Sequence, residues 1–462
     1  LTTAICILIG YPLSYFLSQL PGWVANLCMI TVLLPFWTSL LVRTYAWLVL
    51  LQRKGLVNSW AIDMGLWDEP LKLVHNLTGT LIGMVHIMLP FLVLPVYGSM
   101  RAIDRDYVKA AANLGAGPVA AFWRVFFPLS LPGLFAGALI VFVLCLGFFV
   151  TPAVLGGGRV IMVSMRITTN IELFFNWGAA PTTGPDPRRR PRLMSWLGQP
   201  ASETQITHGR RLWLYAVAVL VMLFLIAPTV IVIPMSFSES QYLEFPPRTW
   251  STRWYDHYLG SIEWISATKT SLIAAFLTMC VATPMGTMAA YGLFTSNLRA
   301  ANLVFLILVT PIMVPVILVA IGIFYAYVKL SLVNTIIGLV LAHSILAIPL
   351  VLVVVSSALK SYDMNQEMVA RSLGASRPRA FMTVTLPQIR FAVVTSALLS
   401  FLTSFDEVII AMFVSGGDNS TLTRSMFNAL RDQIDPTIAT ISTIMIVISS
   451  GLLAVAQIFG KA

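Results

Sequence analysis

Two short stretches decide the fold of this chain: AAANLGA at residues 110–116 and VARSLGA at residues 369–375. Each ends in Leu-Gly-Ala, and each is followed at the same spacing by a phenylalanine and later by a proline. Their glycines lie 259 residues apart, and the phenylalanine and proline positions keep that offset. A repeat at this scale indicates that one module occurs twice in the chain.

The residue types in both stretches predict two short helices joined at a glycine. Alanine favours helix, and Gly115 or Gly374 can end that helix in a left-handed conformation. Small alanine and glycine side chains also permit the close approach of a partner. An ordinary connection between helices is the alternative for one copy alone, but two copies in equivalent positions favour a shared function.

The composition predicts a membrane protein. Of the 462 residues, 58% are hydrophobic and 10% are charged, and the mean hydropathy is +0.84. Soluble domains carry about 25% charged residues. The net charge is +10, but the basic residues lie between apolar runs, which is typical of cytoplasmic loops of membrane proteins. Binding of nucleic acid is therefore not expected.

The cysteine pattern and the missing nucleotide motif narrow the function further. All four cysteines lie inside apolar runs without CxxC spacing, so we expect small buried side chains and no metal site. The sequence also contains no GxxxxGK[ST] phosphate loop. We therefore expect no enzyme activity and no bound cofactor in this chain, and any ATP would be used by a partner subunit.

The apolar runs predict an all-α multi-pass protein with about ten transmembrane helices, because a spanning helix needs roughly 20 apolar residues. The first half offers four runs, at about 1–20, 25–51, 77–99 and 131–155. The second half offers six, at about 212–236, 267–294, 302–328, 332–358, 391–414 and 438–459. Glycine and proline inside these runs are tolerated in membranes when neighbouring helices satisfy the freed backbone groups.

The Lys and Arg distribution predicts a complete second module and an incomplete first one. In the second half the basic segments lie inside if six spans begin and end in the cytoplasm. In the first half the basic loop 100–130 and the basic segment 181–211 cannot both lie inside. Residues 157–180 cannot easily cross, because charges at a helix centre cost about 2.5–3.5 kcal/mol each.

We therefore expect three parts. Residues 1–176 form a first module of four spans that lacks its first and last helices. Residues 177–211 form a basic, Pro- and Arg-rich cytoplasmic linker, and residues 212–462 form a second module of six spans.

The repeated stretches resemble the EAA loop of ABC importer permeases. Three further strings resemble the spermidine/putrescine branch of that family: PFWTSLLVRTYAW at 35–47, FVTPAVLGG at 149–157 and FLTSFDEV at 401–408. The resemblance covers nearly the whole chain. It implies two homologous modules of the type I importer fold in the bacterial inner membrane, and import of a small solute, polyamine above all.

The resemblance also implies partners: two copies of a cytoplasmic ATPase subunit and a periplasmic solute-binding protein, with the lipid bilayer as solvent. Carried over residue by residue, the ATPase-coupling set is Ala110, Ala111, Gly115, Ala116, Ala370, Gly374 and Ala375. Two positions depart from the family pattern. The glutamate of the motif falls on Lys109 in the first copy and on Met368 in the second, where Glu367 stands one position earlier.

Four residues are candidates for the cargo pathway. Asp406 and Glu407 lie deep in an apolar run, where a carboxylate suggests a function and would suit a cationic polyamine. The alternative is a polar contact that locks the helix bundle. Arg43 and Trp47 stand near the outer end of a span. For Arg43, the alternative is a side chain that anchors the helix at the membrane interface.

Other functions are less well supported by the sequence. A membrane-embedded hydrolase using His86 or His343 lacks a GxSxG or HExxH pattern, so both histidines are expected to be packed in the core. A secondary transporter also uses repeats and intramembrane acids, but it would not need two EAA-like loops. Within the importer class, ferric ion or an anion is the alternative cargo.

Overall fold

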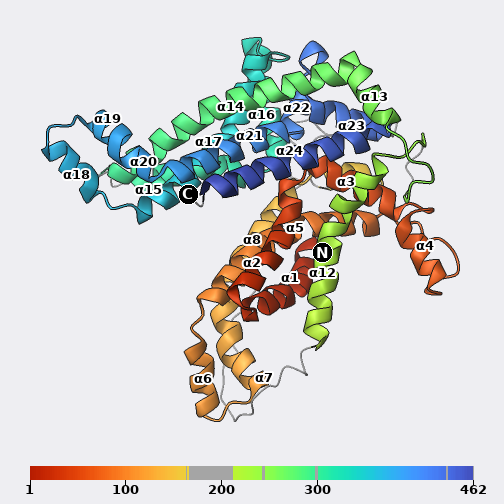
Figure 1. Cartoon of the computed structure of the whole chain (residues 1–462), viewed down its shortest axis with the longest axis horizontal. Helices are drawn as coiled ribbons and strands as arrows, with labels where there is room; N and C mark the ends of the chain where they lie inside the picture. The colour runs from red at the N-terminus through yellow and green to blue at the C-terminus, as the bar shows by residue number, and fades with distance from the viewer. Residues whose placement is uncertain (163, 166–211, 242–244, 297–299, 433–434, 461–462) are drawn as a thin grey trace, which may run out of the picture. The chain divides into compact units, whose positions relative to one another are not determined.

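The structure is a computed structural model, and it describes residues 1–162, 164–165, 212–241, 245–296, 300–432 and 435–460 (Figure 1). The predicted linker 177–211 lies outside the described residues. The described part of the chain is helical, and its one strand-like feature is an isolated bridge between Ser238 and Trp250. The all-α prediction is therefore confirmed.

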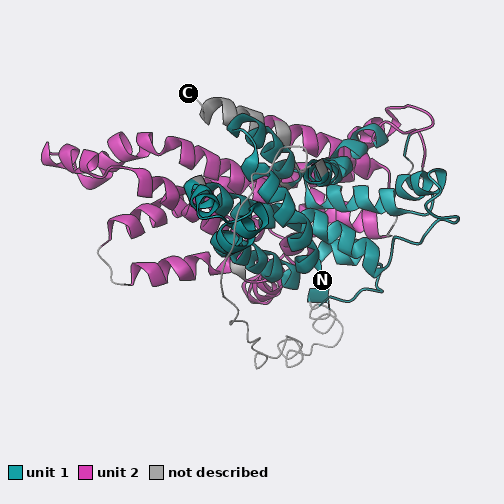
Figure 2. Cartoon of the chain, turned by 90° about the horizontal axis from the view of Figure 1, so that it is seen from below, with its two compact units in different colours: residues 1–235, 244–246 teal, residues 236–243, 247–462 magenta. Residues whose placement is uncertain are grey.

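The chain divides into two compact units (Figure 2). Unit 1 comprises residues 1–235 and 244–246. Its helices are α1 (Thr2–Gln19), α2 (Gly22–Trp37), α3 (Leu40–Leu51), α4 (Leu56–Asp63), α5 (Leu77–Ala102), α6 (Arg105–Asn113), α7 (Pro118–Ala121), the π-helix η1 (Phe122–Phe126), α8 (Phe127–Gly147), α9 (Val150–Leu155) and α12 (Leu212–Met235).

Unit 2 comprises residues 236–243 and 247–462. Its helices are α13 (Arg253–Gly260), α14 (Ile262–Thr295), α15 (Ala301–Met313), α16 (Val316–Leu330), α17 (Ile336–Ser361), α18 (Asn365–Ser372), α19 (Arg377–Ala380), the π-helix η3 (Phe381–Thr385), α20 (Leu386–Gln388), α21 (Arg390–Phe405), α22 (Ile409–Val414), the 3-10 turn η4 (Gly417–Asn419), α23 (Leu422–Asp432) and α24 (Thr437–Gly460).

The duplication extends well beyond the two stretches that predict it. Helices α5 and α17, α7 and α19, η1 and η3, and α9 and α22 each begin and end at the same 259-residue offset. The helix caps are equivalent too: the side chain of Asn76 accepts from the amide of Gly79, and that of Thr335 accepts from the amide of Gly338. The two modules therefore share one backbone arrangement, from α5 to α9 in the first copy and from α17 to α22 in the second.

Even an unusual backbone conformation is repeated. His75 and Asn334 have φ values of 58° and 60°, in the left-handed region that most side chains avoid. The amide of His75 donates to the carbonyl of Leu155, and that of Asn334 donates to the carbonyl of Val414, both at 2.8 Å. In each unit this bond ties the start of the long helix to the end of the short helix α9 or α22.

The apolar runs do form membrane-length helices, but several are broken. Among the described residues, five helices are long and apolar enough to cross a membrane, or up to seven if each bent pair counts as one span. The predicted runs 25–51 and 302–328 are each two helices, joined at Thr38–Ser39 and at Val314–Pro315. Apolar composition alone does not reveal such breaks, since it measures only the preference for lipid.

Two further runs break at equivalent positions. In unit 1, α8 ends at Gly147 and α9 begins at Val150, and in unit 2, α21 ends at Phe405 and α22 begins at Ile409. The predicted continuous spans 131–155 and 391–414 therefore differ from the structure. Short half-helices of this kind expose backbone groups and are used as binding sites in membrane transporters.

Helix α12 belongs to unit 1, where it packs on α1, α2 and α3. The ring of Phe224 lies 5.1 Å from that of Trp47, and the ring of Tyr215 lies 4.7 Å from that of Phe16. Leu225 is fully buried in the core of the unit. The sequence assigned residues 212–236 to the second module by chain order, whereas packing groups them with the first unit.

Candidate functional site

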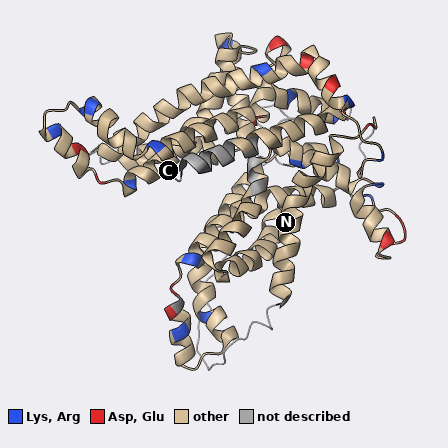
Figure 3. Cartoon of the chain, viewed as in Figure 1, with Lys and Arg blue, Asp and Glu red and all other residues tan. Residues whose placement is uncertain are grey.

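Each repeated stretch forms a projecting pair of helices that we call an elbow: elbow 1 is residues 105–126 and elbow 2 is residues 365–385. Figure 1 shows α6 and α7 at one end of unit 1, and α18 and α19 at one end of unit 2. Charged residues are sparse along the long helices and gather on the elbows and connecting loops (Figure 3). This distribution supports the prediction that the elbows lie outside the bilayer.

The predicted glycine turns are confirmed. Gly115 and Gly374 have φ values of 87° and 94°. The residue after each glycine closes a six-residue ring: Ala116 donates to the carbonyl of Ala111, and Ala375 donates to that of Ala370. This is the Schellman pattern, in which a left-handed glycine satisfies the last carbonyls of a helix.

The tip of each elbow carries an exposed leucine that was not in the predicted coupling set. Leu114 and Leu373, each directly before the glycine, are 88% and 84% exposed. The shared Leu-Gly-Ala string was the signal that could have identified them. Of the predicted set, Ala110 and Gly374 are exposed, and Ala111, Gly115, Ala116, Ala370 and Ala375 are half-buried.

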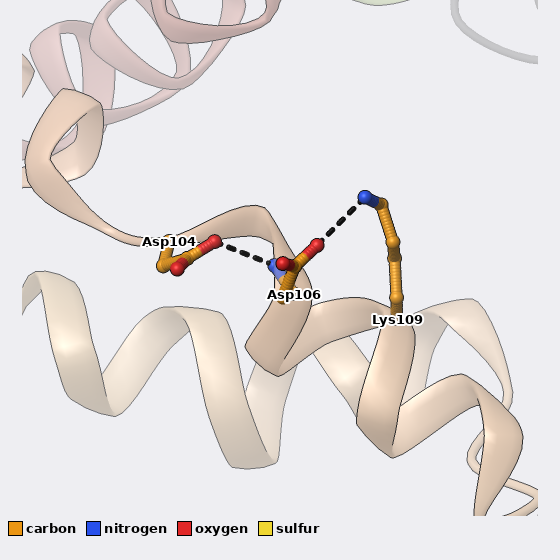
Figure 4. Close-up of polar contacts among 3 residues, drawn as sticks. All are labelled: Asp104, Asp106 and Lys109. Atoms are coloured by element: carbon orange, nitrogen blue, oxygen red, sulfur yellow. Dashed lines mark hydrogen bonds and ion pairs between the residues drawn. The ribbon is translucent and has the colours of Figure 1, made fainter.

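An acidic residue directly before elbow 1 caps its first helix (Figure 4). The side chain of Asp104 accepts from the amide of Asp106 at 2.9 Å, at the start of α6. Lys109, which stands where the motif has glutamate, forms a 2.7 Å ion pair with Asp106. Both partners are more than 70% exposed, and exposed pairs contribute at most about 1 kcal/mol. Lys109 therefore remains accessible at the surface.

The equivalent region of elbow 2 has a different arrangement of side chains. Met368, at the position of the motif glutamate, is 51% exposed, whereas Glu367 is buried. The side chain of Glu367 faces the unit rather than the surface, so the one-position displacement seen in the sequence exchanges an outward carboxyl group for an inward one.

Both elbows contain a π-helical segment, η1 and η3, directly before the Phe-Pro or Leu-Pro step. A π-helix winds its backbone with i→i+5 bonds, is rare, and occurs most often at functional sites. Its repetition at the same offset in both units argues that it belongs to the module's shared design.

In unit 2 the two candidate carboxylates lie at the break between α21 and α22. Both side chains are half-buried. An Oε1 atom of Glu407 accepts from the amide of Ile410 at 2.9 Å, which caps the start of α22. The backbone carbonyl of Glu407 accepts from the hydroxyl of Thr423 at 2.8 Å. The carboxyl group of Glu407 thus makes a local cap at the start of α22, and Asp406 lies between it and the end of α21 at Phe405.

A buried polar chain lies close to this break. Nδ1 of His343 is 2.8 Å from Oγ of Ser404, and Ser404 donates to Oγ1 of Thr278 at 3.3 Å. All three side chains are buried, and Ser404 is two residues from Asp406. This chain joins α17, α21 and α14, so the expectation of a packed, hydrogen-bonded His343 is confirmed.

The other two candidates lie in unit 1, where both are buried. Arg43 and Trp47 are each 6% exposed. The indole of Trp47 lies 5.6 Å from the ring of His86 in an edge arrangement, and it also contacts Phe224. An interfacial anchor would expose the guanidinium group to water, so that alternative for Arg43 does not describe this structure.

Metal chemistry finds no support in the residues that the structure describes. Within them, no group of three or more His, Cys, Asp or Glu side chains is close enough to hold a metal ion. The candidate residues lie on the two elbows, on α3, and at the break between α21 and α22.

The family described as "Binding-protein-dependent transport system inner membrane component" matches residues 8–238 and again residues 282–462. The chain belongs to this family. The two matched ranges confirm the duplicated module, and membership confirms a multi-pass protein of the inner membrane.

Three relatives show how far the similarity extends. The spermidine/putrescine transport system permease protein PotB of Haemophilus influenzae is 37% identical over 40% of this chain and 65% of its own length. PotB of Escherichia coli is 34% identical over 39% of this chain and 66% of its own length. The putrescine transport system permease protein PotI of Escherichia coli is 30% identical over 51% of this chain and 85% of its own length.

The chain thus spans slightly less than two thirds of the PotB proteins that it matches. A crystal structure of a bacterial ABC transporter involved in the import of the acidic polysaccharide alginate aligns with 15% identity and a TM-score of 0.43. That alignment covers 56% of this chain and 99% of the other.

Proposed function

We propose that this chain is the permease of an ATP-driven importer whose two elbows each engage an ATPase subunit. The observation that carries the proposal is the pair of equivalent elbows, each ending in an exposed leucine and a left-handed glycine. An exposed apolar tip on a rigid turn suits insertion into a cleft of a partner, since isolated large apolar side chains gain free energy when they are buried.

The partners follow from this arrangement. Two elbows require two ATPase subunits, or two copies of one, and the small residues Ala110, Ala111, Gly115, Ala116, Ala370, Gly374 and Ala375 would allow close contact with them. A solute-binding protein on the opposite side of the membrane would deliver the cargo. We keep the division by chain order into a first module (1–176), a linker (177–211) and a second module (212–462) as part of the proposal, with α12 of the second module packed in unit 1.

We further propose that the cargo is a polyamine such as spermidine or putrescine, because the relatives named above carry that substrate in their names. Asp406 is the principal candidate for attracting the cation, since it lies at a helix break inside an apolar unit. Glu407 would add negative charge there. Trp47 could contribute an aromatic face to a cation, and Arg43 would set the charge balance of the pathway in unit 1.

Uptake of labelled spermidine tests the proposal. The chain is co-expressed with a candidate ATPase subunit and binding protein in cells that lack polyamine uptake, and vanadate-sensitive ATP hydrolysis is measured in membranes from the same cells. We expect uptake that vanadate abolishes. Asp406→Asn should reduce uptake without affecting assembly, whereas Asp418→Asn, at an exposed carboxylate, serves as the control.

Three results would contradict this proposal in different ways. Uptake driven by a proton gradient without ATP would favour a secondary transporter. ATP-dependent uptake of ferric ion or an anion, with none of spermidine, would overturn only the cargo. Unchanged uptake by Asp406→Asn would remove that residue from the pathway.

A further inference from the structure

Elbow 2 is attached to the rest of unit 2 by a buried carboxyl group. Glu367, on α18, is 1% exposed although most of its neighbours on the elbow face solvent. Its Oε1 atom accepts a 2.5 Å hydrogen bond from the hydroxyl of Tyr291, on α14. Its Oε2 atom accepts from the hydroxyl of Thr385, the last residue of η3. One side chain therefore joins three helices.

Further contacts between elbow 2 and α14 surround this carboxyl group. The ring of Phe381 lies 4.5 Å from the ring of Tyr291. The guanidinium of Arg377 lies over the same tyrosine ring and donates at 2.6 Å to the hydroxyl of Thr295. Tyr291 thus contacts a carboxyl group, an aromatic ring and a cation from successive parts of the elbow.

The energetics make this attachment strongly dependent on fit. A buried polar group without partners loses its desolvation free energy in full, whereas a satisfied one stabilises the fold by a modest net amount. Glu367 has both oxygens satisfied only while α18, η3 and α14 keep their present positions. Elbow 2 therefore packs on α14 in one well-defined position. We call this position its seat: the place beside Tyr291 where Glu367 is held.

Elbow 1 occupies the equivalent seat with different chemistry. Val108 stands 259 residues before Glu367, and it packs against the apolar core of unit 1. Phe126 stands at the position of Thr385, and the ring of Tyr15 lies 5.2 Å from it and 5.1 Å from that of Phe122. The first elbow is held by apolar and aromatic contacts, so the polar seat is specific to the second.

The seat leads directly to the core of unit 2. Helix α14 packs along both α17 and α21, and α21 ends next to Asp406. The packing is tight: a Cβ atom added to Gly286, on α14, would lie 2.6 Å from the Cβ of Val351, on α17. A displacement of α14 therefore cannot be absorbed locally, because closely packed cores transmit strain.

We propose that Glu367 is a positioning residue that locks elbow 2 onto α14, so that movement of the elbow displaces α14 and the helix break that lines the cargo pathway. This inference rests on the proposed function for its driving force, the ATPase subunit. The lock itself is a property of unit 2 and can be measured without any cargo.

Amide hydrogen exchange of the full chain in lipid nanodiscs, co-purified with its ATPase subunit, tests the lock. In Glu367→Ala we expect the amides of α18 and η3 to exchange about tenfold faster, because the two hydroxyl donors lose their acceptor. Glu367→Gln keeps an acceptor for Tyr291 and should restore protection. Tyr291→Phe should give an intermediate loss, and the Glu367→Ala and Tyr291→Phe effects should not add in the double variant.

Tyr258→Phe is the matched control, since it also removes a hydrogen-bonded tyrosine hydroxyl, but from α13, outside the elbow. It should leave exchange in elbow 2 unchanged. If Glu367→Ala fails to fold, the comparison of Tyr291→Phe with Tyr258→Phe still decides the question. Wild-type protection in both Glu367→Ala and Tyr291→Phe would overturn the proposal.

The transmission of movement from elbow 2 to α14 can be measured separately. Glu367→Ala should retain the ATPase subunit on purification but lose most of the stimulation of ATP hydrolysis by loaded binding protein, and Glu367→Gln should recover it. Lost protection together with wild-type stimulation would show that the lock does not transmit movement, and would overturn that step. Failure of polyamine uptake in the wild-type chain would contradict the cargo but leave the exchange result valid.

Discussion

Nε2 of His86, on α5, lies 3.0 Å from the backbone carbonyl oxygen of Leu225, on α12, although 139 residues separate the two. The same imidazole ring packs against Phe224 and Trp47. A helix that follows the linker in the sequence is thus fixed to the core of unit 1 by one buried side chain. Because His86 is fully buried, the loss of its ring would leave the carbonyl of Leu225 without this partner.

His86→Ala should therefore destabilise unit 1 by at least about 1 kcal/mol, because a buried hydrogen bond is lost together with the packing of the ring on Phe224 and Trp47. The measurement is the midpoint of thermal unfolding in detergent. Lys54→Ala is the control, because that side chain is exposed and should change stability by less than about 0.5 kcal/mol. Equal midpoints for the two variants would show that the bond to Leu225 does not hold α12.

Glu407→Ala should destabilise the start of α22 by about 1 kcal/mol, because the amide of Ile410 loses its capping acceptor. Glu407→Gln keeps an acceptor oxygen and should retain wild-type stability. Comparing the thermal midpoints and the uptake of both variants separates capping from charge. If Glu407→Gln is stable yet abolishes uptake, the negative charge and not the cap is what transport requires.

Gly374→Ala should weaken the tip of elbow 2, because a left-handed conformation costs a residue with a Cβ atom about 1–2 kcal/mol. The added methyl group meets no neighbour within 4 Å, so the effect is one of backbone strain alone. We expect less ATPase subunit to co-purify with this variant. Gly322→Ala, in an ordinary helical position with equally open surroundings, should retain the subunit at wild-type levels.

His75 should make the connection between α4 and α5 sensitive to acid. Partial burial, with Lys72 and Arg159 nearby, lowers the pKa of His75 below its ordinary value of 6.5. A lowered pKa means that folding favours the neutral ring, so this stability is present above pH 6.5 and is lost as the pH falls through the lower value of the folded state.

His75→Asn tests this dependence with the residue that the second copy uses at the same left-handed position, Asn334. Between about pH 7 and about pH 5, the wild-type unfolding midpoint should fall more than that of the variant. Parallel curves for the two proteins would show that another group is responsible for any loss in acid.

The sequence was sufficient to predict the duplication, the elbows and their glycine turns, because these depend on local residue types at a fixed spacing. It did not predict the breaks at Thr38 and after Phe405, since an apolar run has the same composition whether its helix is straight or bent. The seat of Glu367 was also missed. Its partner Tyr291 is 76 residues away, and only the fold brings the two together.

The candidate cargo residues show the same limit. The apolar context identified Asp406 and Glu407, but the capping bond to Ile410 depends on where α22 begins. Likewise, the sequence left an interfacial anchor open as the alternative for Arg43, whereas the side chain is only 6% exposed.

The different seats of the two elbows have a consequence for engineering. In a permease built from two identical subunits, every substitution in an elbow alters both elbows at once. Here each elbow is encoded separately, so the attachment of one elbow can be weakened by substitution while the other stays intact. Val108→Glu and Phe126→Thr together would introduce the hydroxyl–carboxyl hydrogen bond into elbow 1. Variants of a single chain could then show how much each elbow contributes to one transport cycle.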